Sequence, residues 1–123
     1  MSETPYRERV LDHYQNPRHR GHLASPDRVG EADNPICGDR VRLELSLDEE
    51  GHVVDAAFTG DGCIICLASA SMLAELAHGM HTDELEELDE QGLLEIVGVE
   101  LGRARRQCAL VALQSLRAAL APD

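Results

Sequence analysis

The chain has 123 residues, a length that fits one domain over residues 1–123, and it carries 11 Lys and Arg against 23 Asp and Glu. The resulting formal net charge of −12 argues against a protein that tracks nucleic-acid phosphates and against binding to an anionic membrane surface. With two Tyr, one Phe and no Trp, the core must be aliphatic, and no aromatic platform for stacked bases is available.

The amino-terminal stretch MSETPYRERVLDHY carries acidic residues and lacks the apolar centre of a secretory signal. No apolar run approaches the roughly 20 residues of a membrane span. We therefore expect a cytoplasmic protein whose thiols stay reduced. In that setting its four cysteines are expected to bind metal or to react, rather than to form disulfides.

The first 36 residues are expected to form one helix and a long loop. Thr4-Pro5 is a helix-start signal, and Tyr6, Val10 and Tyr14 recur at a spacing that predicts an apolar stripe. Asn16-Pro17 should end this helix. Gly and Pro residues then mark a loop, with a short edge strand expected near residues 28–32.

The next segment has the pattern of a β-hairpin. Apolar and polar residues alternate over 41–47, residues 48–51 form a turn signal, and a second strand is expected over 52–59. In that second strand, Val54, Ala56 and Phe58 are predicted to share the buried face.

The remaining residues favour helices. A largely buried helix is expected over 64–78, with Gly79 as its stop. Thr82 is expected to cap a short acidic helix, Asp89 a second one that ends near Gly98, and the last helix should span residues 101–120. Strands followed by helices predict an α+β fold, with a small antiparallel sheet of about three strands packed against several helices.

The hairpin brings two cysteines together. Residues opposed in an antiparallel pair have numbers with a nearly constant sum, here about 100 for a turn centred near residue 50. Cys37 and Cys63 should therefore face each other beyond the open end, with Asp39 beside them. Two thiols and a carboxylate are three candidate ligands for zinc or iron. Gly38, Gly60 and Gly62 would allow the backbone to turn tightly and to come close to the bound group.

Cys108 is the best candidate for a fourth ligand. It follows the basic run Arg103–Gln107, whose guanidinium groups are expected to lower its pKa. Cys66 is interpreted as a small hydrophobic residue on an apolar helix. The Cys63–Cys66 spacing would also suit a thioredoxin-like redox pair, but no parallel βαβ unit accompanies it.

Four segments together resemble the iron–sulfur cluster scaffold family of IscU, SufU and the N-terminal domain of NifU. They are YRERVLDHYQNPRHRG (6–21), PICGDRVRLEL (35–45), FTGDGCIICLASASML (58–73) and RRQCALVAL (105–113). Their order and spacing cover nearly the whole chain, and the resemblance implies the family's α+β fold.

The resemblance also implies site residues, cofactors and partners. By position, the family's metal or cluster ligands fall on Cys37, Asp39, Cys63 and Cys108, and the tyrosine linked to cluster formation and dimer contacts falls on Tyr6. Family members receive sulfur from a cysteine desulfurase of the SufS or IscS type. They assemble a transient [2Fe–2S] cluster for recipient apoproteins or relay the sulfur, and some form homodimers.

Two local features separate the IscU and SufU types. IscU-type members have His directly before the third cysteine, preceded by a Leu-Pro-Pro-Val-Lys chaperone-binding segment, whereas this chain has Gln107 and no such segment. SufU-type members have Arg three residues before that cysteine, which Arg105 matches, but they also carry an insertion that this chain lacks.

The main interpretation is therefore a non-enzymatic scaffold that holds a cluster, with Zn²⁺ or Fe²⁺ at the same ligands. The alternative is a zinc-dependent sulfurtransferase in which Cys108 accepts sulfur and Arg105 activates its thiolate. A third and weaker interpretation is a structural zinc module without sulfur chemistry.

Overall fold

The computed structural model describes the backbone of residues 4–121 and the side chains of residues 7–121. Eight elements follow one another in that part of the chain. They are α1 (Thr4–Gln15), β1 (Arg28–Asn34), β2 (Asp39–Leu47), β3 (Val53–Asp61), α2 (Ile64–Ala77), α3 (Thr82–Glu86), α4 (Glu90–Val97) and α5 (Arg103–Leu120). The strands form one antiparallel sheet in the order β1-β2-β3. The α+β prediction is confirmed.

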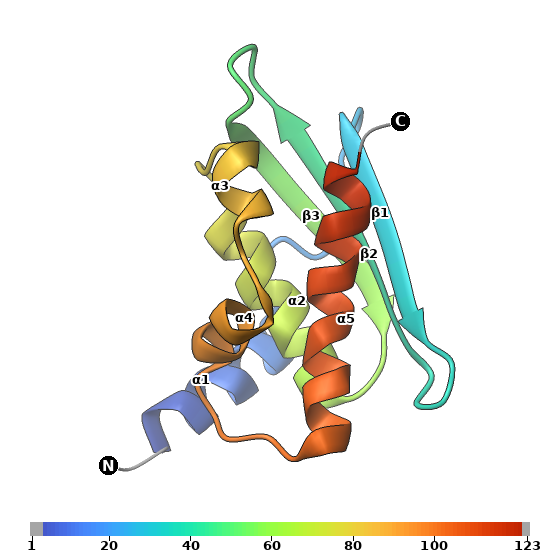
Figure 1. The fold of residues 1–123 in the computed structure, drawn as a ribbon, viewed down its shortest axis with the longest axis vertical. Helices are drawn as coiled ribbons and strands as arrows, with labels where there is room; N and C mark the ends of the chain where they lie inside the picture. The colour runs from blue at the N-terminus through green and yellow to red at the C-terminus, as the bar shows by residue number, and fades with distance from the viewer. Residues whose placement is uncertain (1–3, 122–123) are drawn as a thin grey trace.

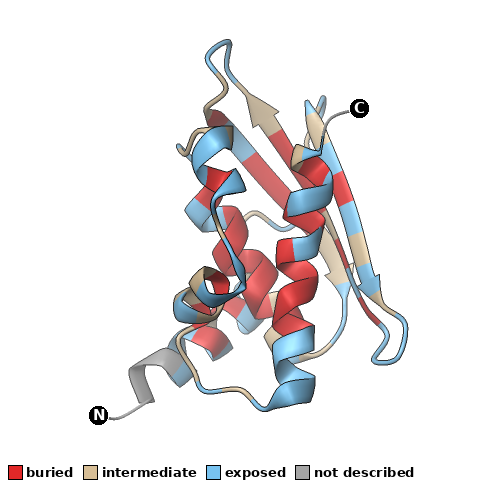
Figure 2. Cartoon of the chain, in the orientation of Figure 1, coloured by how far each residue is buried: buried red, intermediate tan, exposed pale blue. Residues whose placement is uncertain are grey.

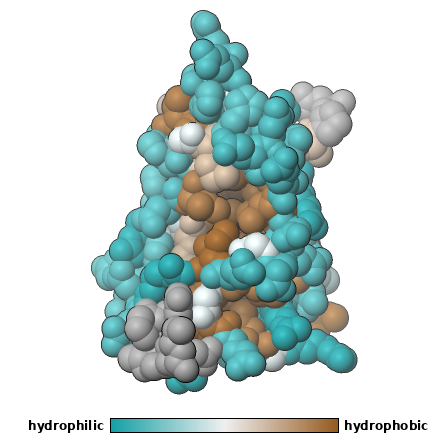
Figure 3. Space-filling model, turned by 60° about the vertical axis from the view of Figure 1, so that its left-hand side comes forward, coloured by the Kyte–Doolittle hydropathy of each residue, from teal (hydrophilic) through white to brown (hydrophobic). Residues whose placement is uncertain are grey.

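The helices gather on one face of the sheet (Figure 1). α5 lies along β1 and β2, α2 packs against β3 and beside α5, and α1 and α4 contact this inner layer from outside. Buried residues line the facing sides of α2, α5 and β2 (Figure 2). In Figure 3 the side of the molecule that carries α1, α3 and α4 is turned toward the viewer. Apolar side chains run along the middle of this side, with hydrophilic ones around them.

β1 is hydrogen-bonded to β2 and packs closely against α5. The strand covers Arg28–Asn34, so the predicted edge strand is confirmed and is longer than expected. Gly30 permits the close approach, because a Cβ at this position would collide with the backbone of α5 at Ser115 and Ala119. The sheet and α5 are thereby fixed to each other at the end of the helix distant from Cys108.

The β2–β3 pairing contains an irregularity that the hairpin prediction missed. The register shifts between Ser46 and Leu47, so Leu45 pairs with Ala56 while Leu47 pairs with Val53. Val53 is buried, whereas Val54 is 51% exposed. The prediction that Val54 lies on the buried face is therefore wrong, because the shift turns its side chain outward.

Glu44 lies on the face of β2 that alternation assigns to solvent, yet it is only 2% exposed. The loop before β1 crosses this face. His22 Nδ1 lies 2.7 Å from Glu44 Oε2, and the backbone N–H of Leu23 donates to Oε1 at 2.9 Å. Arg42 Nε donates to Oε2 at 3.0 Å. This cluster fastens the loop to the outside of the sheet.

The apolar stripe predicted for the first helix is only partly present. Val10 and His13 are buried, while Tyr14 is 38% exposed. His13 Nδ1 lies 2.8 Å from Ser71 Oγ, which also accepts a hydrogen bond from the backbone N–H of Arg18. A polar contact between α1 and α2 therefore takes the place expected for Tyr14. The side chain of Tyr6 lies outside the described residues.

The later helix boundaries mostly confirm the predictions. Gly79, with φ 91°, follows α2, Asp89 caps α4 through the N–H of Gly92, and Gly98 ends α4 with φ 81°. The cap of α3 is His81 rather than Thr82, because the His81 ring accepts a hydrogen bond from the N–H of Asp83. Within residues 4–121, no helix combines the length and apolar character that crossing a membrane would require.

Candidate metal centre

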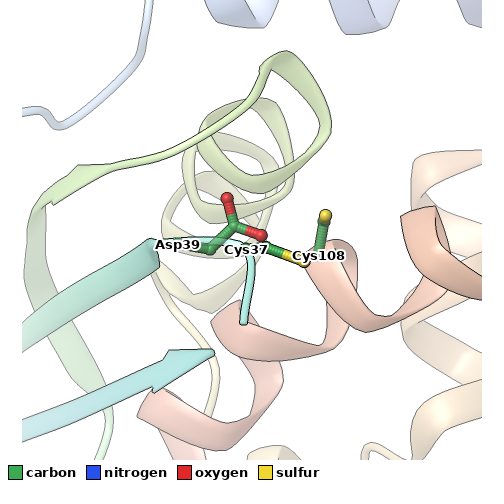
Figure 4. Close-up of side chains that lie close together, drawn as sticks. All are labelled: Cys37, Asp39 and Cys108. Atoms are coloured by element: carbon green, nitrogen blue, oxygen red, sulfur yellow. The ribbon is translucent and has the colours of Figure 1, made fainter. Parts of the chain in front are cut away.

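Three segments converge where α5 begins and the β1–β2 turn ends. Cys37 comes from that turn, Asp39 from the first position of β2 and Cys108 from the second turn of α5 (Figure 4). One ligand atom from each of the three lies within 4.8 Å of the others. Of the sequence-predicted set, these three residues are brought together directly.

The turn that carries Cys37 is held by Asn34. The backbone carbonyl of Asn34 accepts hydrogen bonds from the N–H of Cys37 at 3.1 Å and of Gly38 at 2.8 Å. Its side-chain oxygen accepts from the N–H of Ile36 at 3.2 Å, and its Nδ2 donates to Cys37 Sγ at 3.6 Å. Gly38 adopts φ 75°, which favours glycine. Sequence reasoning missed Asn34, although an Asn that opens a turn is a known signal.

Asp39 is the buried carboxylate of the site, with 2% of its surface exposed. Its Oδ1 accepts a 3.1 Å hydrogen bond from the backbone N–H of Cys63, while its Oδ2 is buried with no hydrogen-bond partner in the described part of the chain. Leaving a carboxylate oxygen in this state is costly. A cation beside the two thiols would satisfy it.

Gly62 leaves room for this carboxylate. A Cβ on Gly62 would lie 2.5 Å from Asp39 Oδ1 and 3.1 Å from Cys66 Sγ. Any larger residue would therefore push Asp39 or Cys66 out of place. The sequence reasoning that assigned Gly62 to a close backbone approach is consistent with this geometry.

The predicted pairing of Cys37 with Cys63 needs a correction. Arg40 pairs with Asp61, so the β2–β3 numbers sum to 101 at this end, and continuing the ladder places Cys63 opposite Gly38. The prediction erred by one residue because the register shift near the hairpin turn was not foreseen. Cys63 lies outside the group of three described above, and it contacts the site through its backbone bond to Asp39 and a thiol hydrogen bond with Cys108.

Cys63 is half-buried and caps α2 with extended backbone angles. Its thiol therefore sits at the positive end of a helix, where a thiolate is favoured. Cys66, one turn further along, is fully buried, and burial raises the pKa of its thiol to about 12. All four cysteines are free thiols. The interpretation of Cys66 as a core residue agrees with this burial, and the antiparallel sheet offers no support for a thioredoxin-like pair.

The thiol of Cys108 is 4% exposed. Burial raises its pKa, and hydrogen bonds with Asp39 and Cys63, together with repulsion from their charges, act in the same direction. The prediction that the basic run lowers the pKa of Cys108 is therefore wrong for the protein without a bound partner. Arg105 is exposed, so solvent weakens its effect, whereas Asp39 is buried beside the thiol.

Three thiols and one carboxylate are a donor set that suits zinc or an iron–sulfur cluster. Cys37, Cys63 and Cys108 could offer the sulfur atoms, and Asp39, whose Oδ2 has no hydrogen-bond partner among the described residues, could offer an oxygen. The fold and this donor set together define a small α+β protein with a thiol-rich centre at one end of its sheet.

The family follows from direct comparison. The model of the NifU-like N terminal domain matches residues 5–122, and the chain belongs to this family. It is 35% identical to the zinc-dependent sulfurtransferase SufU of Bacillus subtilis, over 98% of this chain and 92% of that protein. It is 33% identical to the iron–sulfur cluster assembly scaffold protein IscU of Escherichia coli, over 94% of this chain and 91% of IscU.

A solved structure extends the likeness to the fold. The crystal structure described as a putative iron–sulfur cluster assembly scaffold protein for the SUF system of Fervidobacterium islandicum superposes with a TM-score of 0.78. The two sequences are 26% identical, and the match covers 98% of this chain and all of the other. The resemblance noted from the sequence motifs is thus confirmed.

Proposed function

We propose that this chain is an iron–sulfur cluster assembly protein. It accepts sulfur from a cysteine desulfurase, assembles a transient [2Fe–2S] cluster on Cys37, Asp39, Cys63 and Cys108, and passes the cluster to recipient apoproteins. The observation that carries this proposal is the buried Asp39 carboxylate. Its Oδ2 has no hydrogen-bond partner among residues the structure describes, and one of its oxygens lies within 4.8 Å of the thiols of Cys37 and Cys108. We place the protein in the cytoplasm, where those thiols stay reduced.

In this proposal sulfur arrives by persulfide exchange at Cys108. The Cys108 thiolate attacks the outer sulfur of the donor's persulfide, a new S–S bond forms on Cys108, and the donor cysteine leaves as a thiolate. No electrons are gained or lost overall. Arg105 lies one helical turn earlier and is exposed in the free protein, so it would favour the thiolate only once a bound donor excludes solvent from the site.

Asp39 would be the exchangeable ligand. Thiolates suit iron and zinc well, whereas a single carboxylate oxygen is a harder donor and gives way more readily to an incoming thiol. Zinc bound by the same four residues would hold their thiols as thiolates. In the scaffold function iron and sulfide are the cargo, and the protein is not a catalyst.

Reconstitution tests the scaffold function directly. The purified protein would be mixed anaerobically with a cysteine desulfurase, cysteine, a thiol reductant and ferrous iron, and visible absorption would be recorded. We expect [2Fe–2S] bands that disappear in Cys37→Ser but persist in Cys66→Ser, which serves as a matched control inside the core. Equal cluster yields in all three proteins would contradict the assignment of the site.

A second function is favoured by the residues before Cys108. Arg105 matches the SufU type, and Gln107 departs from the His of the IscU type. The SufU of Bacillus subtilis is similar over almost the whole chain. In this alternative the protein relays persulfide sulfur from its zinc-bound site and never holds a cluster. Desulfurase turnover stimulated without iron, together with no cluster in the reconstitution, would select it.

A further inference from the structure

Ile36 is the most exposed of the large apolar side chains in the described part of the chain. It is 94% exposed, whereas the other exposed large apolar residues range from Val29 at 37% to Val54 at 51%. Near-complete exposure of an isoleucine side chain is unfavourable, because transferring apolar surface out of water lowers the free energy. Single exposed apolar side chains are common on protein surfaces, so a role for Ile36 depends on where the turn places it.

The turn presents this side chain in a fixed direction. Asn34 accepts hydrogen bonds from the N–H groups of Ile36, Cys37 and Gly38, and its amide contacts Cys37 Sγ. Pro35 restricts the backbone directly before Ile36. These contacts hold the turn on both sides of Ile36. The backbone of Ile36 would therefore lose little conformational entropy when a partner binds its side chain.

Ile36 also lies where a sulfur donor must make contact. Cys37 is its neighbour in the chain, and Cys37 Sγ is within 4.8 Å of the donor atoms of Asp39 and Cys108. Cys108 is only 4% exposed and Asp39 only 2%. A donor persulfide can reach these buried groups only if the donor's surface closes over the turn, and this places Ile36 inside the interface.

A second copy of this chain is a poor occupant of the same position. Each copy carries a formal net charge of −12, so two copies repel each other when this end of the sheet meets its own image. An anionic membrane surface is disfavoured for the same reason. A donor protein with a neutral or basic contact surface and an apolar pocket beside its reactive cysteine has neither difficulty.

We propose that Ile36 is the docking anchor by which this chain binds its sulfur donor, by inserting into an apolar pocket on the donor near the persulfide. The proposal rests on the function proposed above and assigns one of its partner contacts. A few desolvated apolar side chains supply most of the affinity in many interfaces, and a preorganised knob next to the reacting group is suited to that role.

The experiment compares Ile36→Ser with Val54→Ser. Val54 is the matched control, because it is also an exposed aliphatic residue but lies at the opposite end of the hairpin. The dissociation constant of each zinc-loaded protein for the desulfurase would be measured by calorimetry. The KM and kcat of desulfurase turnover would be measured with each protein as the sulfur acceptor. Melting temperature and zinc content verify that both variants are folded and loaded.

We expect Ile36→Ser to weaken binding by about 10-fold or more, the size of a hot-spot truncation, and to raise KM while kcat at saturation stays unchanged. Val54→Ser should bind like the wild type, and Ile36→Leu should restore binding. If the wild type binds and Ile36→Ser binds equally well, the anchor is wrong and the proposed function stands. If the wild type neither binds nor is used as an acceptor, both fall. Loss of self-association in Ile36→Ser, with donor binding unchanged, would assign the residue to a homodimer instead.

Discussion

The backbone N–H of Cys63 donates a 3.1 Å hydrogen bond to Oδ1 of Asp39, while Oδ2 of the same carboxylate is buried with no hydrogen-bond partner in the described part of the chain. The hydrogen bond connects the residue that precedes α2 to the first residue of β2. One oxygen of this carboxylate lies within 4.8 Å of the sulfur atoms of Cys37 and Cys108 (Figure 4). The donor set therefore follows from backbone geometry as well as from residue type.

Replacing Asp39 with Ala separates a scaffold from a structural zinc site. A scaffold that loses its exchangeable oxygen ligand should keep its cluster several-fold longer, because the remaining ligands are thiolates. The decay of the visible cluster bands in the presence of a recipient apoprotein measures this lifetime. A structural site would only lose zinc affinity, and an unchanged cluster lifetime would remove the role assigned to Asp39.

Gly62→Ala should disturb the site through its backbone as well as its side chain, because Gly62 adopts φ 156°, where a residue with a Cβ is strained. The added methyl group would lie 2.5 Å from Asp39 Oδ1, so we expect a loss of about 1–3 kcal/mol in the free energy of unfolding, as for other overpacked sites. Zinc affinity should fall as well. Gly21→Ala is the control, since Gly21 also has a positive φ, 136°, but no atom lies within 4 Å of a Cβ at that position. Chemical denaturation and zinc titration of both variants test this, and equal losses would refute the steric argument.

Glu44 should make stability depend on pH in the acid range. Burial acts to raise its pKa, but hydrogen bonds from His22, Leu23 and Arg42 outweigh it and lower the pKa from 4.5 to about 2. The folded protein therefore releases this proton more readily than the unfolded chain. The stabilisation is complete above pH 4.5 and is lost as the pH falls toward 2, at about 3 kcal/mol in total.

Glu44→Gln should remove this dependence. Urea denaturation at a series of pH values between about 2 and 5 would follow the free energy of unfolding, whose slope reports the difference in bound protons. The variant should be less stable than the wild type at neutral pH and should lose less stability on acidification. A wild type and variant with parallel profiles would contradict the hydrogen-bonded state of Glu44.

His13 should add a pH dependence at higher values. Burial lowers its pKa from 6.5, and Arg18 acts in the same direction. Below pH 6.5 the unfolded chain therefore binds a proton at His13 more readily than the folded protein does. The contribution of neutral His13 to the free energy of unfolding is complete above pH 6.5 and declines as the pH falls below it. In His13→Gln the free energy of unfolding should be flat across this window, and thermal melts between about pH 5 and 7 measure it.

The fold was largely predictable from the sequence because its signals are local. Alternation over 41–47, the capping residue Asp89 and the glycines at 79 and 98 each depend on a few adjacent residues. Val54 was misplaced because a register shift between Ser46 and Leu47 follows from packing, which no local pattern encodes.

The centre was predictable in part for the same reason. The hairpin argument brought Cys37, Asp39 and Cys63 to one end even though the register was wrong by one residue. The pKa of Cys108 could not be foreseen, because it depends on burial beside Asp39 rather than on the adjacent arginines. Asn34 was missed although an Asn that opens a turn is a sequence signal, and the structure shows its side chain accepting a hydrogen bond from the N–H of Ile36.

The central claim is that this chain accepts sulfur at Cys108 beside the carboxylate of Asp39. The most direct test is the turnover of a cysteine desulfurase without iron or thiol reductant, with and without the zinc-loaded protein, together with the intact mass of the acceptor. We predict a large stimulation and the gain of one sulfur atom, about 32 Da, on the wild type by persulfide exchange, and neither in Cys108→Ala. Stimulation and an added sulfur that persist in Cys108→Ala would contradict the account.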